Sequence, residues 1–513
     1  MKKVLLVVID ALASRVVFPA MDAGRLPNIK SLADAGAIAP DCTAIFPSIT
    51  QAATSSITTG RYPQAHGIAG SHWYEPDRDH VAYYGADFWV IWEKGIGEFF
   101  DGFLNKLNHE RLHADTLFQI IERTGKQAAS LNYLMFRGDR RHKVNVPLLL
   151  GILPGVPFSE EIYGPALFRL GDFVGPDLDG VDLSISTKGP FEKFGFEDKY
   201  TAQNLIKLAE QRKLPDFTIA YFPDNDFDSH ERGPEQAVTT LEQVDSYLGE
   251  FIAAAGGQEA LLAECCILVT GDHSQTDMPA DASQAGIDLD AILSEFDVSK
   301  AGTAMTEDDQ IVICPDMRIA TIYFRRPTTE RITRVSTRLL EDLRIDQVLW
   351  ASEVTGEGGR GYYVTTRDRG GLHFWPGDDG PHIAADAQGG TWSWDGDLRT
   401  VDGQVQDGVI TFPTYPNAFE RIAGVLALEQ SGDLWMTAHP GHEFLISGVE
   451  LHPGGSHGSL HRDDSTMPLL LAGAPEGVTL PAHPRTVDVA PLCLNVLRIE
   501  PPYAVGASHV RQE

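Results

Sequence analysis

The chain has 513 residues, of which 43% are hydrophobic and 22% charged, a composition typical of a folded globular protein and not of a disordered one. Its formal net charge of −31 argues against a protein that coats nucleic acid, because such a surface repels phosphate backbones. A bound cation can reverse the field locally, so a small phosphorylated substrate remains compatible with this charge.

The N-terminal segment MKKVLLVVIDALASRVV contains a short apolar run, residues 4–9, that ends at Asp10. The run is too short for the core of a signal peptide, and no small-residue cleavage site follows, so we expect a buried first strand. No other stretch approaches the roughly 20 apolar residues of a membrane span. Five cysteines without zinc-finger spacing indicate a reduced protein that has no disulfide framework. We therefore expect a cytoplasmic protein without a membrane partner.

The next segment, FPSITQAATSSITTGRYPQAHGI (46–68), is dense in hydroxyl groups. Thr50 directly precedes a predicted helix, and a hydroxyl at a helix N-terminus lies where backbone N–H groups and the helix dipole favour an anion. Thr50 is therefore our candidate nucleophile. The same argument admits Ser48, Thr54 and Ser55.

The stretch FTIAYF (217–222) predicts a second buried strand, and FPDNDFDSHERG begins at its end. Asp226 and His230 are four residues apart, so their side chains can converge on one metal ion at a first helical turn. Asp224 and Asp228 do not fit this ligand pattern, and we assign them supporting or turn roles. The following segment, EQAVTTLEQVDSYLGEFIAAAGG, predicts a helix.

Two further apolar runs, CCILVT (265–270) and MPLLLAG (467–473), predict buried parallel strands. Asp272 and His273 follow the first of them. Strands that alternate with helices predict an α/β fold with a mostly parallel sheet. Ligands bind beyond the carboxyl ends of strands in such sheets, so the polar residues at three strand ends predict one shared site.

The residue composition changes over the region 276–440, where glycine, aspartate, threonine and aromatic residues suggest short antiparallel hairpins. We expect an inserted α+β cap over 276–440, and a discontinuous core formed by 1–275 and 441–513.

His457 lies between glycines in PGGSHGSLH, and it completes a set of three imidazoles and three carboxylates. Mixed nitrogen and oxygen ligands suit Zn²⁺, or Mn²⁺ and other first-row metals. Six such ligands suit two ions with three protein ligands each. Two ions about 4 Å apart would clamp the attacking and leaving oxygens in a phosphoryl transfer.

The pieces VVIDA, FPSITQAATSSITTGRYPQAHGI, DFDSHERGP, VTGDHS and GSHG occur in the order seen in the alkaline phosphatase superfamily. They most resemble its nucleotide pyrophosphatase/phosphodiesterase branch, the type I phosphodiesterases. The resemblance implies an alkaline-phosphatase-like core with a mostly parallel central sheet flanked by helices. It also implies two Zn²⁺ ions, one held by Asp226, His230 and His457 and the other by Asp10, Asp272 and His273, with Thr50 as the nucleophile.

Sulfatases share TGRYPQAHG but would show C-x-P-S-R from position 50, where this chain has TQAAT, so a sulfatase is excluded. The phosphodiesterase branch usually has an asparagine three residues after the nucleophile, where it donates a hydrogen bond to a phosphate oxygen, and this chain has Ala53 at that position. Either Gln51, Thr54 or another segment supplies the donor, or the substrate differs. Trp73 and Tyr74 are candidates for stacking on an aromatic leaving group, with core packing as the alternative.

The expected function is hydrolysis of phosphodiesters or nucleotide pyrophosphate bonds through a phosphothreonine intermediate, with a small phosphate ester such as a nucleotide as the substrate. Three alternatives stay open on the same sequence. The first is a phosphomonoesterase or phosphonate hydrolase that uses the same site. The second is a mutase or transferase. The third, of another class, is a metal-binding interaction protein without catalytic activity.

Overall fold

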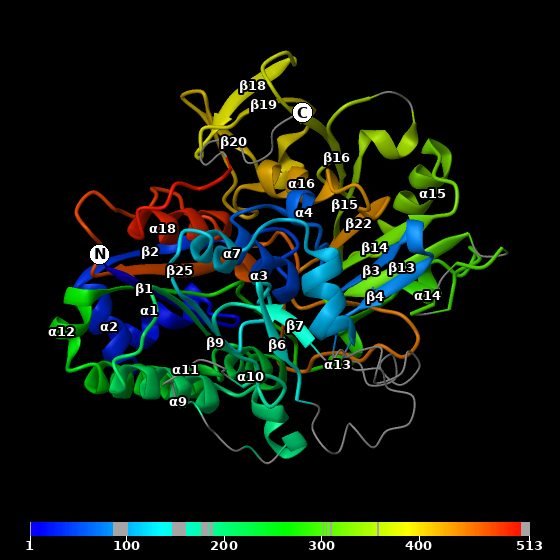
Figure 1. Cartoon of the computed structure of the whole chain (residues 1–513). Helices are drawn as coiled ribbons and strands as arrows, with labels where there is room; N and C mark the ends of the chain where they lie inside the picture. The colour runs from blue at the N-terminus through cyan, green and yellow to red at the C-terminus, as the bar shows by residue number, and fades with distance from the viewer. Residues whose placement is uncertain are drawn as a thin grey trace.

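The computed structural model of the chain describes residues 2–85, 101–145, 161–175, 189–300, 310–356 and 359–503, with short pieces at 183, 187, 302–303 and 305–307. It is a mixed α/β fold built on two large sheets, which we call the core sheet and the second sheet (Figure 1). The predicted fold class is confirmed.

Within these ranges, seven strands form the core sheet. Their order is β2 (Gly36–Thr43), β25 (Thr466–Ala472), β10 (Cys265–Thr270), β1 (Lys3–Ile9), β9 (Phe217–Phe222), β5 (Ala128–Leu131) and β8 (Leu167–Arg169). The strands from β10 to β8 are parallel to one another, so the predicted strands at 4–9, 217–222 and 265–270 are confirmed. Their carboxyl ends meet at one edge of the sheet.

The strand predicted at 467–473 exists as β25, but its predicted direction is wrong. β25 runs antiparallel to both neighbours, β10 and β2. A strand that is buried on both faces reads as a continuous apolar run whichever way it points. The apolar pattern therefore predicts burial correctly and carries no information about direction.

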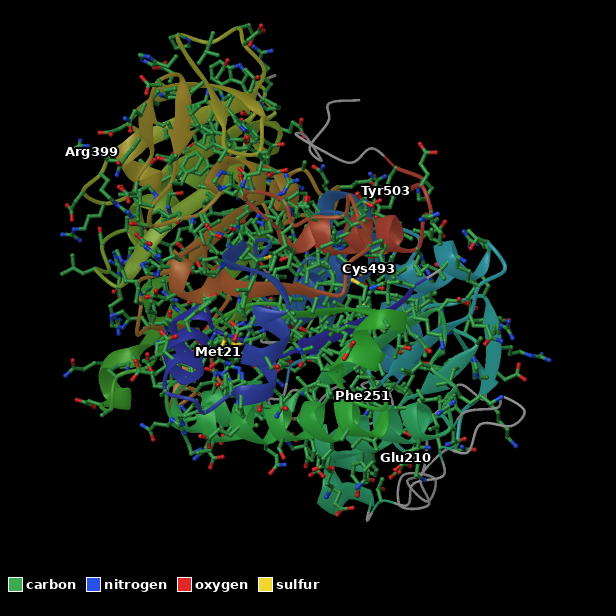
Figure 2. All side chains as sticks on the ribbon, turned by 90° about the vertical axis from the view of Figure 1, so that its left-hand side faces the viewer. Met21, Glu210, Phe251, Arg399, Cys493 and Tyr503 are labelled. Carbon is green, nitrogen blue, oxygen red and sulfur yellow. The ribbon has the colours of Figure 1, made fainter. Side chains whose placement is uncertain are left out.

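Side chains of the core strands alternate between two apolar layers, as the pleat of a strand requires. Leu6 and Val8 of β1 pack in one layer with α3 (Thr50–Thr59), α7 (Leu117–Glu122) and α18 (Val489–Val496). Leu5 and Val7 face the other layer, which contains α1 (Ser14–Asp22), α2 (Pro27–Asp34), α9 (Asp198–Glu210), α11 (Val238–Ala254) and α12 (Gln258–Glu264). Figure 2 shows Cys493 of α18 on one side of the sheet and Phe251 of α11 on the other.

Helix α11 confirms the helix predicted from its spacing of apolar residues. Leu241, Val244 and Leu248 all face the core. All five cysteines lie in described ranges, and each is buried and free. Among the helices that the structure describes, none has the length and apolar character needed to span a membrane.

The second sheet has ten strands in the described part of the chain. Their order is β13 (Ile311–Asp316), β14 (Ile319–Phe324), β22 (Leu434–Ala438), β15 (Ile345–Ala351), β16 (Tyr362–Thr365), β17 (Gly371–Pro376), β19 (Thr391–Gly396), β18 (His382–Asp386), β21 (Val409–Thr411) and β20 (Gln404–Gln406). Neighbours are antiparallel except β18 and β21. Helices α15 (Thr329–Leu339) and α16 (Ala418–Leu426) pack in its two apolar layers. We propose that this sheet is the body of the insertion at 276–440.

Further, mostly shorter helices and strands lie in the described ranges. They are α4 (Pro63–His66), β3 (His72–Glu75), β4 (His80–Tyr83), a π-helix (Gly102–Arg111), β6 (Arg140–Lys143), β7 (Glu161–Gly164), α10 (Asp224–Arg232), β11 (Thr276–Asp277), α13 (Ala282–Ala285), β12 (Gly286–Asp288), α14 (Leu289–Ile292), β23 (Glu443–Leu445), β24 (Gly455–Ser456) and α17 (Arg462–Ser465). The strand pair β11–β24 joins the segment that follows His273 to the segment that precedes His457.

Candidate metal centre

Thr50 is the first residue of helix α3, as predicted. The N–H groups of a first helical turn have no partner within the helix, and the helix dipole favours negative charge there. The Thr50 hydroxyl lies 3.0 Å from Nε2 of His273. The candidate nucleophile therefore stands both at a helix N-terminus and beside a predicted metal ligand.

A first group of ligand atoms forms from Asp226, His230 and His457, whose side chains lie within 4.8 Å of one another. Asp226 and His230 are one turn apart on α10, and Nε2 of His230 lies 3.4 Å from Oδ1 of Asp226. Nε2 of His457, just beyond β24, lies 3.7 Å from the same oxygen. The structure thus brings together the three residues expected for the first ion.

A second group contains Asp10, at the end of β1, with His273 and again Asp226. Nε2 of His273 lies 3.3 Å from Oδ1 of Asp10 and 3.7 Å from Oδ2 of Asp272. The rings of His273 and His457 stack with centroids 3.7 Å apart, so the two groups adjoin. Asp226 lies in both groups, a feature that the sequence does not predict.

Each of the three histidines uses its Nδ1 atom for a bond to a backbone carbonyl. His457 is 2.7 Å from the carbonyl of Ser48, His230 is 2.8 Å from that of Gly455, and His273 is 3.1 Å from that of Ser274. A carbonyl accepts only, so Nδ1 carries the proton and Nε2 presents its lone pair to the group. This is the arrangement in which histidine binds a metal, with the second nitrogen oriented by a hydrogen bond.

Three buried polar atoms of the predicted ligands, one of them on Asp272, which lies beside the second group and outside it, have no hydrogen-bond partner among the described residues. They are Oδ1 of Asp10, Oδ2 of Asp272 and Nε2 of His457. Two other carboxylate oxygens accept hydrogen bonds: Tyr221 donates to Oδ2 of Asp10, and Gln275 donates to Oδ1 of Asp226 at 2.5 Å. Buried polar groups are normally paired, so converging lone pairs without a donor fit a cation between them.

The pKa shifts of residues in the centre also favour a bound cation. Burial, together with the neighbouring carboxylates of Asp272 and Asp226, raises the pKa of Asp10 well above that of an ordinary aspartate. Burial lowers the pKa of His457, and the rings of His273 and His230 lower it further. Neutral imidazoles are the ligating form, whereas the crowded carboxylates require positive charge to ionise together. A divalent cation would supply that charge.

The segment before Thr50 is bonded directly to the loop that carries His457. The Ser48 N–H donates to the carbonyl of Gly458 at 3.2 Å, and the Ser48 hydroxyl donates to that of Ser459 at 3.0 Å. The loop also requires glycine for its close approach to α10, because an added Cβ at Gly455 would lie 2.7 Å from the carbonyl oxygen of Ser229. These contacts fix the nucleophile relative to the ligands.

The other carboxylates of FPDNDFDSHERG have partners of their own. Asp224 accepts hydrogen bonds from the Asp198 N–H at 2.8 Å and from Lys193 at 3.1 Å. Asp228 accepts hydrogen bonds from Arg232 and Thr240. Both therefore hold α10 in place, in agreement with the supporting roles predicted for them.

The predicted donors beside Thr50 are in different settings. Gln51 is half-buried, and its amide lies 3.4 Å from the carbonyl of Tyr84. The Thr54 hydroxyl donates to the carbonyl of Thr50 at 2.6 Å, within the helix, which leaves it no proton for a phosphate oxygen. Ala53 is buried in the apolar layer of the second sheet, so the absence of a polar group there has a packing reason.

Trp73 and Tyr74 lie in the core, where the structure supports the packing alternative. Their exposed fractions are 3% and 6%. Trp73 packs against Tyr84 with ring centroids 5.6 Å apart, and the Tyr74 hydroxyl donates to Asp79 at 2.6 Å. Neither ring presents a face to a leaving group in this arrangement.

We expect Trp73→Ala to destabilise the protein by about 3–5 kcal/mol, because it removes a large buried ring and leaves a cavity. Chemical denaturation measures this change in the free energy of unfolding. In the fraction that stays folded, the KM for an aromatic phosphodiester should match that of the wild type. A large rise in KM with unchanged stability would restore the role of Trp73 as a stacking platform.

Sequence reasoning missed the residues that orient the ligands. Tyr221 lies inside the apolar run of β9, and Gln275 follows the Asp-His pair by two positions. Their bonds to Asp10 and Asp226 join segments more than 45 residues apart, as the separations of 211 and 49 positions show. No local pattern in the sequence marks such partners.

Three solved structures illustrate the fold that this chain shares. Phosphonoacetate hydrolase from Sinorhizobium meliloti 1021, in complex with phosphonoformate, matches with a TM-score of 0.56 and 17% identity over 96% of both chains. Murine ectonucleotide pyrophosphatase / phosphodiesterase 5 matches with a TM-score of 0.56 and 14% identity over 98% of this chain and 97% of that one. An inactive threonine-to-alanine variant of it in complex with AMP matches at 0.55, with 14% identity over 99% and 97% of the two chains.

Among curated proteins, none matches the chain significantly in sequence. The model of the family described as "Type I phosphodiesterase / nucleotide pyrophosphatase" matches residues 4–459. That span includes Thr50 and all six predicted ligands. The chain therefore belongs to the type I phosphodiesterase / nucleotide pyrophosphatase family, enzymes that hydrolyse phosphoric esters, as its motifs predict.

Proposed function

We propose that the protein cleaves phosphodiester or nucleotide pyrophosphate bonds through a phosphothreonine intermediate at a two-zinc site. The observation that carries this proposal is the position of Thr50, whose hydroxyl lies 3.0 Å from Nε2 of His273 at the border of two adjoining ligand groups. The substrate would be a small phosphate ester such as a nucleotide. The presence of a candidate nucleophile beside the candidate ligands argues against the alternative of a silent metal-binding protein.

Asp226, His230 and His457 would hold one ion, and Asp10, Asp272 and His273 the other. Zn²⁺ suits these mixed ligands, and Mn²⁺ is an alternative. Two such ions supply positive charge that stabilises the attacking and leaving oxygens of an in-line displacement. Asp226 lies within reach of both groups and would couple their occupancies.

In the first step, Oγ of Thr50 forms a bond to phosphorus as the bond from phosphorus to the leaving oxygen breaks. The helix N-terminus favours the negative charge on Oγ, and the proton lost from the hydroxyl is balanced by one gained on the leaving alcohol. In the second step, water attacks the phosphothreonine and restores the hydroxyl. The products are an alcohol and a phosphate monoester for a diester substrate, and two phosphate-containing fragments for a pyrophosphate, in which a phosphate takes the place of the leaving alcohol.

Phosphonate hydrolysis is a second candidate for the same site. The structure resembles phosphonoacetate hydrolase and ectonucleotide pyrophosphatase / phosphodiesterase 5 equally well, with TM-scores of 0.56. The fold therefore does not separate the two substrate classes. The choice between them depends on the groups that surround the leaving group.

The test compares hydrolysis of bis-p-nitrophenyl phosphate, p-nitrophenyl phosphate and phosphonoacetate by the same zinc-loaded preparation. We expect the diester to be cleaved at least about 10-fold faster than the monoester, and activity to vanish after chelation and return with Zn²⁺ or Mn²⁺. Faster release of phosphate from phosphonoacetate would favour the second candidate. No hydrolysis of any of the three by a metal-loaded protein would contradict the proposal.

A further inference from the structure

The turn that joins β13 to β14 carries charged side chains from the second sheet into the interior beside the metal centre. Arg318 follows Met317 in this turn and is completely buried. A buried guanidinium is costly unless it is paired and fully bonded. The partners of Arg318 therefore indicate which segments the turn holds together.

Arg318 contacts three separate parts of the chain. One terminal nitrogen donates to the carboxylate of Asp464 and, at 2.9 Å, to the hydroxyl of Thr276. The other donates to the carbonyl of Ala438 at 2.9 Å. The backbone N–H of Arg318 donates to the carbonyl of His457 at 3.0 Å. The second sheet thus holds a predicted metal ligand directly by its backbone.

Asp464, the ionic partner of Arg318, binds both ligand-bearing loops. Its Oδ2 accepts hydrogen bonds from the Ser459 N–H at 2.9 Å and from the Ser459 hydroxyl at 2.6 Å, two residues after His457. Its backbone carbonyl accepts from the N–H of Ser274 at 2.9 Å, directly after His273. Oδ1 accepts from Thr276 at 2.6 Å. One buried aspartate therefore sets the spacing between the loops of two ligands that belong to different groups.

Asp316, directly before this turn, contacts a further segment of the chain. Asp316 accepts hydrogen bonds from the N–H of Ser71 at 2.7 Å and from its hydroxyl at 2.6 Å. Ser71 follows the segment that begins with the helix of Thr50. This part of the second sheet therefore binds the segment of Ser71 through Asp316 and the loop of His457 through Arg318.

We propose that Arg318 is a positioning residue that fixes the loops of His273 and His457 through Asp464, so that the second sheet contributes directly to metal affinity. The inference rests on the proposed function only in taking these two histidines as ligands. Without the guanidinium, the carboxylate of Asp464 would be a buried charge without its partner, and the loops bonded to it would shift to reach water. Residues that orient ligands in this way typically change metal affinity by about 10–100-fold.

The experiment measures zinc affinity by competition with a chelator, and zinc content by elemental analysis, on wild type, Arg318→Met and Arg318→Lys. We expect Arg318→Met to bind zinc about 10–100-fold more weakly than wild type. Lysine keeps the charge but lacks the planar fork that reaches two partners, so Arg318→Lys should give an intermediate loss. Ser459→Ala, which removes one hydrogen bond and leaves the ion pair, is the milder variant if Arg318→Met fails to fold.

Arg485→Lys is the matched control. Arg485 is also buried, but its guanidinium donates to Glu420 and Asp488 instead of to a residue that holds the ligand loops. This control should lower the melting temperature and leave zinc affinity unchanged. Folded Arg318→Lys and Ser459→Ala proteins that bind zinc as tightly as wild type would overturn the inference. A wild type that binds zinc but hydrolyses no phosphate ester would contradict the proposed function alone.

Discussion

Thr50→Ala is expected to abolish turnover while leaving the bound metal in place. Removal of the hydroxyl deletes the atom that forms the covalent intermediate, and loss of a nucleophile typically lowers kcat by about a thousandfold or more. The six predicted ligands do not include Thr50, so zinc content should match that of wild type. Steady-state kinetics with bis-p-nitrophenyl phosphate and elemental analysis of the same preparation measure both quantities.

Thr59→Ala is the matched control for this variant. Thr59 lies in the same helix and its hydroxyl donates to the carbonyl of Ser55 at 2.7 Å, far along the helix from the N-terminal turn. It should retain nearly full activity. Acid quenching of the wild type during turnover of bis-p-nitrophenyl phosphate should yield a p-nitrophenyl phosphoryl group attached to Thr50 in peptide mass spectra. A Thr50→Ala protein with wild-type activity would refute the covalent scheme.

Asp226→Asn is expected to have the second large effect, because the carboxylate of Asp226 lies in both ligand groups. An amide removes one negative charge and one ligand oxygen from the centre. Zinc affinity should fall by at least about 100-fold, more than the loss typical of an orienting residue, and kcat should fall with it. Titration of the metal-free protein with zinc should show that the occupancy of both positions is affected.

The control for Asp226→Asn lies two residues further along the same helix. Asp228 accepts hydrogen bonds from Arg232 and Thr240 and faces away from the ligand groups. Asp228→Asn should keep zinc affinity and activity, with at most a small loss of stability from an exposed ion pair. Equal loss of zinc in both variants would show that the helix as a whole, and not the carboxylate of Asp226, is responsible.

Much of the core could be predicted because its signals are local. An apolar run followed by an acidic residue defines the strand and the strand end at Asp10, and the apolar spacing of 238–254 defines a helix. The position of Thr50 at a helix start follows from one short segment. The carboxyl ends of parallel strands then bring these residues to one edge without further information.

The remaining features depend on contacts between distant segments. The direction of β25 is set by where the chain re-enters the sheet, and its apolar run does not record this. Tryptophan is a residue type that often stacks on ligands, yet the fold buries Trp73 against Tyr84. Arg318 and Asp464 are 146 positions apart, and each reads as an ordinary surface charge in the sequence. The candidate metal ligands can therefore be predicted from the sequence more readily than the residues that orient them.

The most direct test of the two-ion centre is a crystal structure of the zinc-loaded protein with phosphate or AMP, with anomalous scattering used to locate the metal. We expect two zinc peaks. One should lie beside Asp226, His230 and His457, and the other beside Asp10, Asp272 and His273. The phosphate should lie between the peaks and the hydroxyl of Thr50. A single peak, peaks outside these groups, or a phosphate remote from Thr50 would contradict this expectation.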